Sequence, residues 1–211
     1  MLGSEEERGL MFITLEELFN KIISNSADRE YKIKLWYLEI YNENIKDLLS
    51  PGDENCDLRE DPQKGTIVSN ITELEVSNSK DIMNLLRKGN KNRTQEATNA
   101  NETSSRSHAI LQVLVEYKDK VTGTDAEIKI GKLSLIDLAG SERAKETLNK
   151  GLRLIEGANI NRSLLTLGNC INALCEANEK GTKPYVPYRD SKLTRLLKVN
   201  LLTINKTLIF F

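Results

Sequence analysis

The chain has 211 residues, which is enough for one sizeable domain with its own hydrophobic core. Apolar residues make up 39% and charged residues 29% of the sequence, a balance that excludes an intrinsically disordered chain. No stretch approaches the roughly 20 apolar residues that span a bilayer, and the acidic N-terminus lacks the apolar run of a signal peptide. The net charge of −1 gives no argument for bulk nucleic-acid binding. We therefore interpret the chain as cytosolic.

The first half of the chain alternates between helical and strand patterns. Thr14–Glu17 has the form of a helix capping box, and apolar residues then recur at helical spacing. Alternating apolar residues predict a strand over 31–41, and the turn formers of 42–65 predict loops around a short element. A second strand region is expected over 67–76, followed by a helix over 79–89.

The second half begins with a predicted hairpin, formed by strands over 109–117 and 127–138. Apolar residues spaced by three and four then predict a helix that includes 160–174, and a final helix carries three leucines within 193–197. Because strands and helices are interleaved, we expect an α/β domain whose central sheet is covered on both faces.

The second strand of that hairpin ends on a carboxylate, Asp137, and Gly140 follows three residues later. Ligands of open α/β sheets bind beyond the carboxyl ends of strands, and an aspartate there can hold Mg²⁺ through water. A glycine lets its backbone N–H approach a phosphate closely. Alone, this Asp-x-x-Gly pattern also occurs in unrelated turns.

A polar stretch, Asn101–His108, precedes the other hairpin strand and carries three serines and an arginine. Serine hydroxyls can ligate Mg²⁺ and phosphate oxygens, and the Arg106 guanidinium suits a carboxylate such as Glu142. The alternative is a serine-rich loop beside a surface salt bridge. His108 is the only histidine, for which we expect a structural hydrogen bond rather than catalysis.

Several segments resemble motifs of the kinesin motor domain. Asn101–His108 and Asp137–Glu142 resemble its two nucleotide switches, and Asn159–Gly168 resembles its relay helix. Tyr185–Arg195 is similar to its main microtubule-contacting loop with the helix that follows, and Tyr37–Glu43 matches another strand of the family. Four long motifs in the right order and spacing make coincidence negligible.

Two further segments, Gly9–Thr14 and Gly168–Ala173, look most like the kinesin-8 class. The resemblance implies a three-layer α/β motor domain, with a central mixed sheet flanked by helices and incomplete at both ends. It implies a partial motor domain over 1–198 and a divergent tail over 199–211. That tail is either a degenerate version of the family's next strand or translated noncoding sequence.

The resemblance implies ATP and Mg²⁺ as ligands and hydrolysis by phosphoryl transfer to water. Three residues would sense the γ-phosphate or position the attacking water: Arg106, Gly140 and Glu142. Four would bind the nucleotide: Asn101, Ser104, Ser105 and Asp137. Of these, Ser105 and, through water, Asp137 would hold Mg²⁺.

The resemblance also implies a microtubule partner and a cytoplasmic, cytoskeletal location, without nucleic acid or membrane. Seven basic residues fall in the segments that face the microtubule in this family: Lys145, Lys150, Arg153, Arg162, Arg189, Lys192 and Arg195. Since tubulin's surface is acidic, such a patch would speed encounter and weaken with salt. For Lys150 and Arg153, a solvated surface is an equally good interpretation. Dimerisation would use regions outside the chain.

A motor of this kind holds the β- and γ-phosphates in a Gly-x-x-x-x-Gly-Lys-Thr/Ser loop, and no segment matches that pattern. We expect that the chain begins just after this loop and that, in isolation, it does not hydrolyse ATP at a motor-like rate. Three interpretations stay open: a piece of an ATPase motor, a catalytically silent microtubule-binding module, and a truncated gene product. The tubulin-contact motif disfavours a fourth, a GTPase.

Overall fold

The computed structural model describes residues 8–50, 52, 56–62, 65–95, 106–120, 127–141, 152–181 and 185–202. Its helices are α1 (Leu10–Ser24), α2 (Ser79–Gln95), α3 (Leu152–Lys180) and α4 (Lys192–Leu202), with a short 3₁₀ helix, η2 (Tyr188–Asp190). Its strands are β1 (Arg29–Tyr41), β2 (Asn44–Asp47), β3 (Asp57–Asp61), β4 (Gly65–Ser69), β5 (Leu74–Glu75), β6 (His108–Asp119) and β7 (Lys129–Asp137). None of these described helices is both long and apolar enough to cross a membrane.

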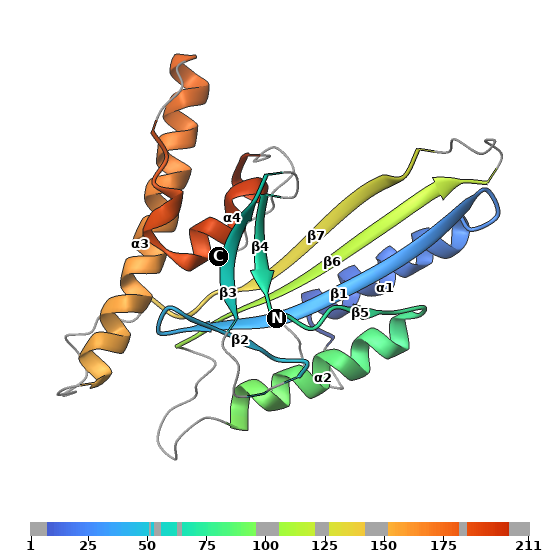
Figure 1. Ribbon diagram of the computed structural model, residues 1–211, viewed down its shortest axis with the longest axis horizontal. Helices are drawn as coiled ribbons and strands as arrows, with labels where there is room; N and C mark the ends of the chain where they lie inside the picture. The colour runs from blue at the N-terminus through green and yellow to red at the C-terminus, as the bar shows by residue number, and fades with distance from the viewer. Residues whose placement is uncertain are drawn as a thin grey trace.

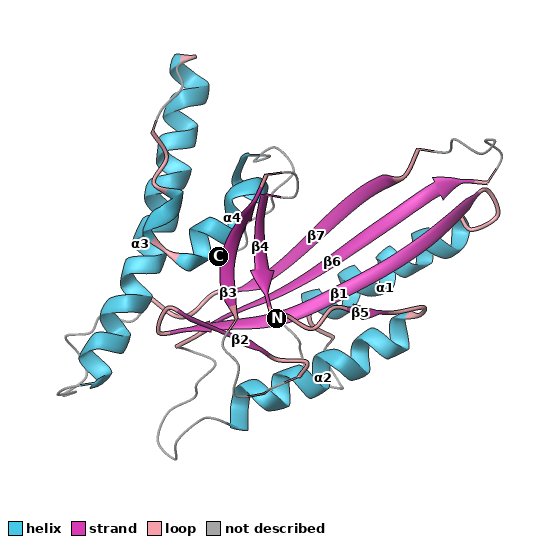
Figure 2. Cartoon of the chain, in the orientation of Figure 1, coloured by secondary structure: helices cyan, strands magenta, loops and turns pink. Residues whose placement is uncertain are grey.

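The main sheet has the order β2-β1-β6-β7, with β5 also paired to β1, and β3 and β4 form a separate two-stranded sheet. Every pairing among the described strands is antiparallel. The long strands β1, β6 and β7 run side by side, with α1 and α2 on one face and α3 and α4 on the other (Figures 1 and 2). The predicted α/β class with a helix-flanked sheet is confirmed.

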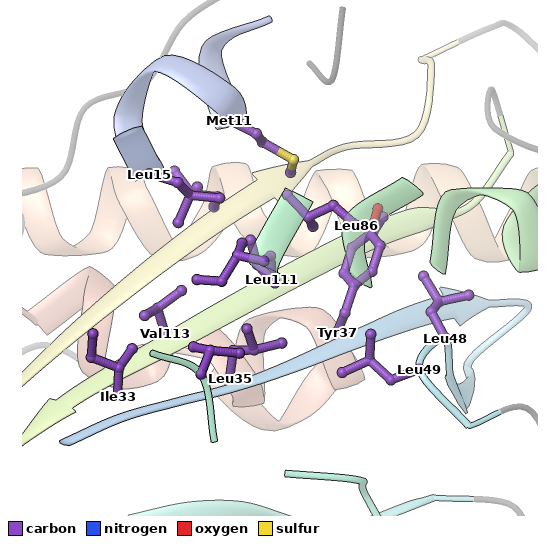
Figure 3. Packing of buried hydrophobic residues seen from close by; sticks show 14 of the residues in the cluster. Met11, Leu15, Ile33, Leu35, Tyr37, Leu48, Leu49, Leu86, Leu111 and Val113 are labelled. Atoms are coloured by element: carbon purple, nitrogen blue, oxygen red, sulfur yellow. The ribbon is translucent and has the colours of Figure 1, made fainter. Parts of the chain in front are cut away.

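The face under α1 and α2 is an apolar core (Figure 3). Leu35 and Leu111 point into it from neighbouring strands, and Tyr37 joins them with its ring buried against α2. A Cβ on Gly89 would lie 2.5 Å from Cδ1 of Tyr37, so only glycine allows α2 to approach the sheet this closely. Burial raises the pKa of the Tyr37 hydroxyl to about 12.

The opposite face mixes apolar and polar contacts. Its apolar part packs α3, α4 and the β3–β4 hairpin on the sheet through Leu38, Ile40, Ile45, Cys56, Ile110, Cys170, Leu193, Leu196, Leu197 and Leu201. A polar row crosses the same face: the indole N–H of Trp36 donates to Oε1 of Gln112 at 2.8 Å. The Gln112 amide donates to Oγ of Ser134 at 3.2 Å, and Asn200 of α4 donates to the same oxygen at 3.2 Å.

The start of the first helix that the capping-box pattern predicts, at Thr14, is wrong. Thr14 lies inside α1, which begins at Leu10 after Gly9, and no side chain caps it. The reason is burial: Met11, Leu15 and Phe19 form one stripe at intervals of four residues, and all three are almost fully buried. Packing on the sheet therefore extends this helix four residues before the capping-box sequence.

The last described helix also crosses a predicted boundary, since α4 continues past Lys198 to Leu202. Leu201 is buried and Asn200 bonds to the sheet, so the first residues of the predicted tail pack on the domain. Residues 203–211 lie outside the described part of the chain, and for them the divergent tail stays a prediction.

Candidate functional site

The candidate site lies at the edge where β6 begins and β7 ends. The two strands are antiparallel with Ala109 opposite Asp137, so segments that are far apart in sequence become neighbours here. Just beyond this pair, the backbone N–H of Ala139 donates to Nδ1 of His108, and Arg106 and Gly140 each lie within three residues of the paired strand ends. Both are partly buried. The described parts of the two predicted sensor motifs therefore meet at one end of the sheet.

Asp137 is held by a buried arginine that the sequence analysis missed. Nη1 of Arg93, near the end of α2, donates to Oδ2 of Asp137 at 2.8 Å. Its Nη2 donates to the carbonyl of Ser107 at 2.7 Å and its Nε to the Ser107 hydroxyl at 3.1 Å. The buried carboxylate of Glu39 lies 3.8 Å from Nε. Arg93 thus joins the start of β6, the end of β7 and β1.

A sequence signal for Arg93 does exist. The residues of α2 that face the sheet are Ile82, Leu86 and Gly89, and Arg93 continues that row at intervals of four, three and four. Its side chain is only 2% exposed. A charged residue in register with a buried helical stripe indicates a buried partner, because an isolated charge there would be very costly.

His108 occupies the other side of the same edge, and its structural hydrogen bonds agree with the sequence prediction. Its Nδ1 accepts the backbone N–H of Ala139 at 3.0 Å, and its Nε2 lies 2.8 Å from Oγ of Ser163 in α3. Burial, reinforced by the nearby Arg93 charge, lowers the pKa of His108 to about 4. The imidazole is therefore neutral near pH 7.

Several predicted site residues lie outside the described part of the chain: Asn101, Ser104, Ser105, Glu142, Lys145 and Lys150. The side chain of Arg153 also lies outside it, although its backbone belongs to α3. The Arg106–Glu142 contact and the serine contacts to nucleotide stay predictions. Arg106, Asp137 and Gly140 are the described members of the predicted sensor.

Four predicted basic contact residues are described, and they fall into two kinds. Arg162 of α3 and Arg189 of η2 are exposed, and neither forms an ion pair with another described residue. In contrast, Nζ of Lys192 lies 3.9 Å from the carboxylate of Asp57, and Nη2 of Arg195 lies 3.8 Å from that of Glu60. Both carboxylates belong to β3. About three tenths of each of the latter two side chains is exposed.

The turn between β1 and β2 ties the sheet to both helices of this face. Asn42 and Glu43 have φ values of 50° and 59°, the left-handed conformation of a tight hairpin turn. The Glu43 carboxylate accepts the backbone N–H of Lys192 at 3.0 Å, which caps the start of α4. Asn42 accepts a hydrogen bond from the amide of Asn159 in α3.

The Asp137 carboxylate fits the role of holding Mg²⁺ through water. It terminates a strand, a third of its side chain is exposed, and Oδ2 alone accepts a hydrogen bond from a described residue. Oδ1 thus has no protein donor among the described residues. A carboxylate that is oriented by an arginine and open on one oxygen can accept from a metal-bound water.

Known proteins resemble this chain along nearly all of its length. The kinesin motor domain family model matches residues 1–211. The chain is 58% identical to "Kinesin-like protein KIF19" of Xenopus laevis over 95% of its own length and 20% of that protein's. It is 52% identical to "Kinesin-like protein KIN-8A" of Arabidopsis thaliana over 95% of its length and 27% of that protein's. The chain thus spans about a fifth to a quarter of these curated relatives.

Two solved structures share its fold. A KIF14 dimer with AMP-PNP, in complex with a microtubule, has a TM-score of 0.83 at 37% identity, covering 94% of this chain and 57% of that one. A fast kinesin has a TM-score of 0.80 at 39% identity, covering 94% and 54%. The chain belongs to the kinesin motor domain family, and its relatives include proteins of the kinesin-8 class.

Proposed function

We propose that this chain is the part of an ATP-driven microtubule motor that senses the γ-phosphate and contacts the microtubule. The observation that supports the proposal is that Arg93 bonds to both Ser107 and Asp137, so the end of one predicted motif lies beside the start of the other. A sensor of this kind needs two loops that reach the same phosphate, and the β6–β7 pairing starts both segments from the same end of the sheet. Microtubule-based movement in the cytoplasm follows for the whole protein.

In this proposal each residue keeps the role that the family motifs suggest. Asp137 orients a water on Mg²⁺, and Gly140 offers its backbone N–H to the γ-phosphate. Arg106 pairs with Glu142 to position the attacking water, while Asn101, Ser104 and Ser105 contact the nucleotide. Bound Mg²⁺ would neutralise charge on the phosphates. Arg93 keeps the Asp137 carboxylate in place for this task.

The microtubule-facing surface in this proposal is the side of α3, η2 and α4. Arg162 and Arg189 are exposed on this surface, and neither has an ion-pair partner among the described residues. Lys192 and Arg195 contribute less, because β3 already provides each with a carboxylate at close to 4 Å. The KIF14 structure with a microtubule supports a microtubule partner for this fold. Lys145, Lys150 and Arg153 remain candidate contacts because they fall in segments that face the microtubule in this family.

Co-sedimentation with microtubules tests the proposal. We expect the chain to pellet with microtubules at low salt and to dissociate as the salt concentration rises. Arg162→Glu and Arg189→Glu should each weaken binding about tenfold, which is roughly 1.4 kcal/mol. Arg87→Glu is the matched control, since Arg87 is exposed on α2, across the sheet. Equal losses in all three variants would contradict the proposed surface.

A second candidate function is a microtubule-binding module without catalysis. It is favoured by the lack of any Gly-x-x-x-x-Gly-Lys-Thr/Ser pattern in the 211 residues. The discriminating measurement is microtubule affinity in ADP and in a non-hydrolysable ATP analogue. Affinity that differs between the two nucleotides supports the sensor, and identical affinities support the silent module.

A further inference from the structure

We propose that His108 is a positioning residue that couples the Asp137–Gly140 loop to α3, so that the two move together. This inference rests on the proposed function, in which that loop senses phosphate and α3 faces the microtubule. The proposed function gives His108 no contact with nucleotide or Mg²⁺. His108 acts through Ala139 on one side and Ser163 on the other.

The hydrogen-bond partners of the ring fix its tautomer. The backbone nitrogen of Ala139 can only donate, so Nδ1 of His108 must accept and carries no proton. Nε2 therefore holds the proton and donates it to Oγ of Ser163. The Ser163 hydroxyl in turn donates to the carbonyl of Ile160, one turn back in α3, at 2.8 Å. These three hydrogen bonds run in a single direction, from Ala139 through His108 and Ser163 to Ile160.

Burial makes the row costly to break. His108 and Ser163 are 2% and 1% exposed, so water is not available to replace either hydrogen bond without a larger opening. A buried polar group that loses its partner carries the full desolvation penalty. Because the imidazole is rigid and bonded at both nitrogens, a shift of Ala139 must either carry Ser163 with it or leave a buried group unsatisfied.

The Ser163–His108 hydrogen bond is a buried polar link between α3 and the rest of the described domain. The helix packs chiefly against α4 and η2, and it extends away from the sheet in Figure 1. Among the described side chains, Asn159 bonds to Asn42 in the β1–β2 turn and Ser163 bonds to His108, four residues apart on the helix. Exposed Arg162 immediately precedes Ser163. Displacement of the loop would thus be transmitted to the part of α3 that bears a candidate microtubule contact.

The first test measures the coupling between α3 and the Asp137–Gly140 loop in the absence of nucleotide and microtubules. In the 211-residue chain, Ser163→Ala removes the acceptor in α3, and the amide ¹H–¹⁵N resonance of Ala139 is recorded. We expect that resonance to shift, although Ser163 does not bond to Ala139. Thr166→Val is the matched control: Thr166 is buried on the same helix, but its hydroxyl donates to the carbonyl of Arg162.

The same spectra test the tautomer, because His108 is the only histidine of the chain. The ¹⁵N shifts of its ring at pH 7.5 should show a protonated Nε2 and a bare Nδ1. An unchanged Ala139 resonance in Ser163→Ala, or a proton on Nδ1, would overturn the inference. An equal shift in Thr166→Val would also overturn it, since the effect would then be a general response of α3.

The second test separates this inference from the proposed function. Microtubule affinity is measured in ADP and in a non-hydrolysable ATP analogue, for the wild type and both variants. We expect the ratio of the two microtubule affinities to fall at least about fivefold toward one in Ser163→Ala. In Thr166→Val the ratio should equal that of the wild type. A wild-type ratio of one contradicts the phosphate sensor, while the NMR result still decides on the His108 link. A wild-type ratio that Ser163→Ala retains contradicts the His108 link alone.

Discussion

The two faces of the sheet are built differently. Under α1 and α2, leucines, isoleucines and valines interlock around Tyr37, and charge is found at the end near the site, where Arg93 meets Glu39 and Asp137. Under α3 and α4, apolar residues share the interface with buried polar groups: His108, Gln112, Ser163, Thr166, Ser191 and Thr194. The first face depends on close packing and the second on directional hydrogen bonds.

This difference suggests different mechanical roles for the helices on the two faces. An apolar interface with interlocking side chains resists sliding, because every shift opens cavities. Directional hydrogen bonds between helix and sheet make the joined segments move together between discrete arrangements, which is what a switching element needs. We infer that α1 and α2 form the rigid support of the domain and that α3 and α4 form its adjustable side.

The largest effect should come from Arg93→Met. The substitution leaves Glu39 and Asp137 without their shared cation, and breaking a buried ion pair by removing one partner costs about 4 kcal/mol. Urea unfolding measures the loss. Arg87→Met, at an exposed position of the same helix, should change the free energy of unfolding by less than about 0.5 kcal/mol. A loss below about 1 kcal/mol for Arg93→Met would show that the buried cluster is dispensable.

The apolar face should respond next. Leu111→Ala removes a fully buried side chain from the α1–α2 core, and substitutions of this kind cost about 3 kcal/mol. Leu165→Ala on the exposed side of α3, where the side chain is 66% exposed, is the control and should be nearly neutral. Similar unfolding midpoints for the two variants would refute the tight packing of this face.

Because His108 is buried on the polar face, we predict that the free energy of unfolding depends on pH. Folding lowers the pKa of His108 from 6.5 to about 4, so between these values the unfolded chain binds a proton that the folded chain does not. The contribution of His108 to stability is therefore complete above pH 6.5 and is lost as the pH falls toward 4. About 2 kcal/mol of it should be gone by pH 5.

Comparing wild type with His108→Gln at pH 7.5 and pH 5 isolates this effect, because carboxylates titrate equally in both and no second histidine exists. The difference in the free energy of unfolding between the two proteins should shrink by about 2 kcal/mol at the lower pH. A difference independent of pH would mean that the buried imidazole is not held neutral.

The smallest effect concerns the ion pairs that connect α4 to β3. Glu60→Gln removes the partner of Arg195, at a separation of 3.8 Å between partly exposed groups. Surface pairs of this kind contribute less than about 1 kcal/mol, so stability should hardly change. The same variant frees Arg195, and salt-dependent microtubule binding should become slightly tighter. Weaker binding would show that Glu60 itself takes part in the contact.

The strands were predictable because their pattern is local. Alternation from Tyr31 to Tyr41 and the apolar run after His108 each reflect which face of a sheet a residue occupies, and neither depends on distant residues. Asp137 was found for the same reason, since it terminates a strand. Motif resemblance added the family and the kinesin-8 class.

The contacts that join distant segments were not predictable. Arg93 meets Asp137 across 44 residues, and His108 meets Ser163 across 55. The ion pairs of Lys192 and Arg195 depend on where the β3–β4 hairpin packs on α4, which no local pattern specifies. The start of α1 was misplaced because its buried stripe, and not a capping residue, determines where that helix begins.

A cryo-electron microscopy reconstruction of the chain bound to microtubules would show directly which face of the domain contacts tubulin. We predict that α3, η2 and α4 lie against tubulin, with Arg162 and Arg189 at the contact. The α1–α2 face should point away from the microtubule. A reconstruction in which α1 and α2 contact tubulin, or in which α3 is remote from it, would contradict both the proposed surface and the division of the molecule into a rigid and an adjustable face.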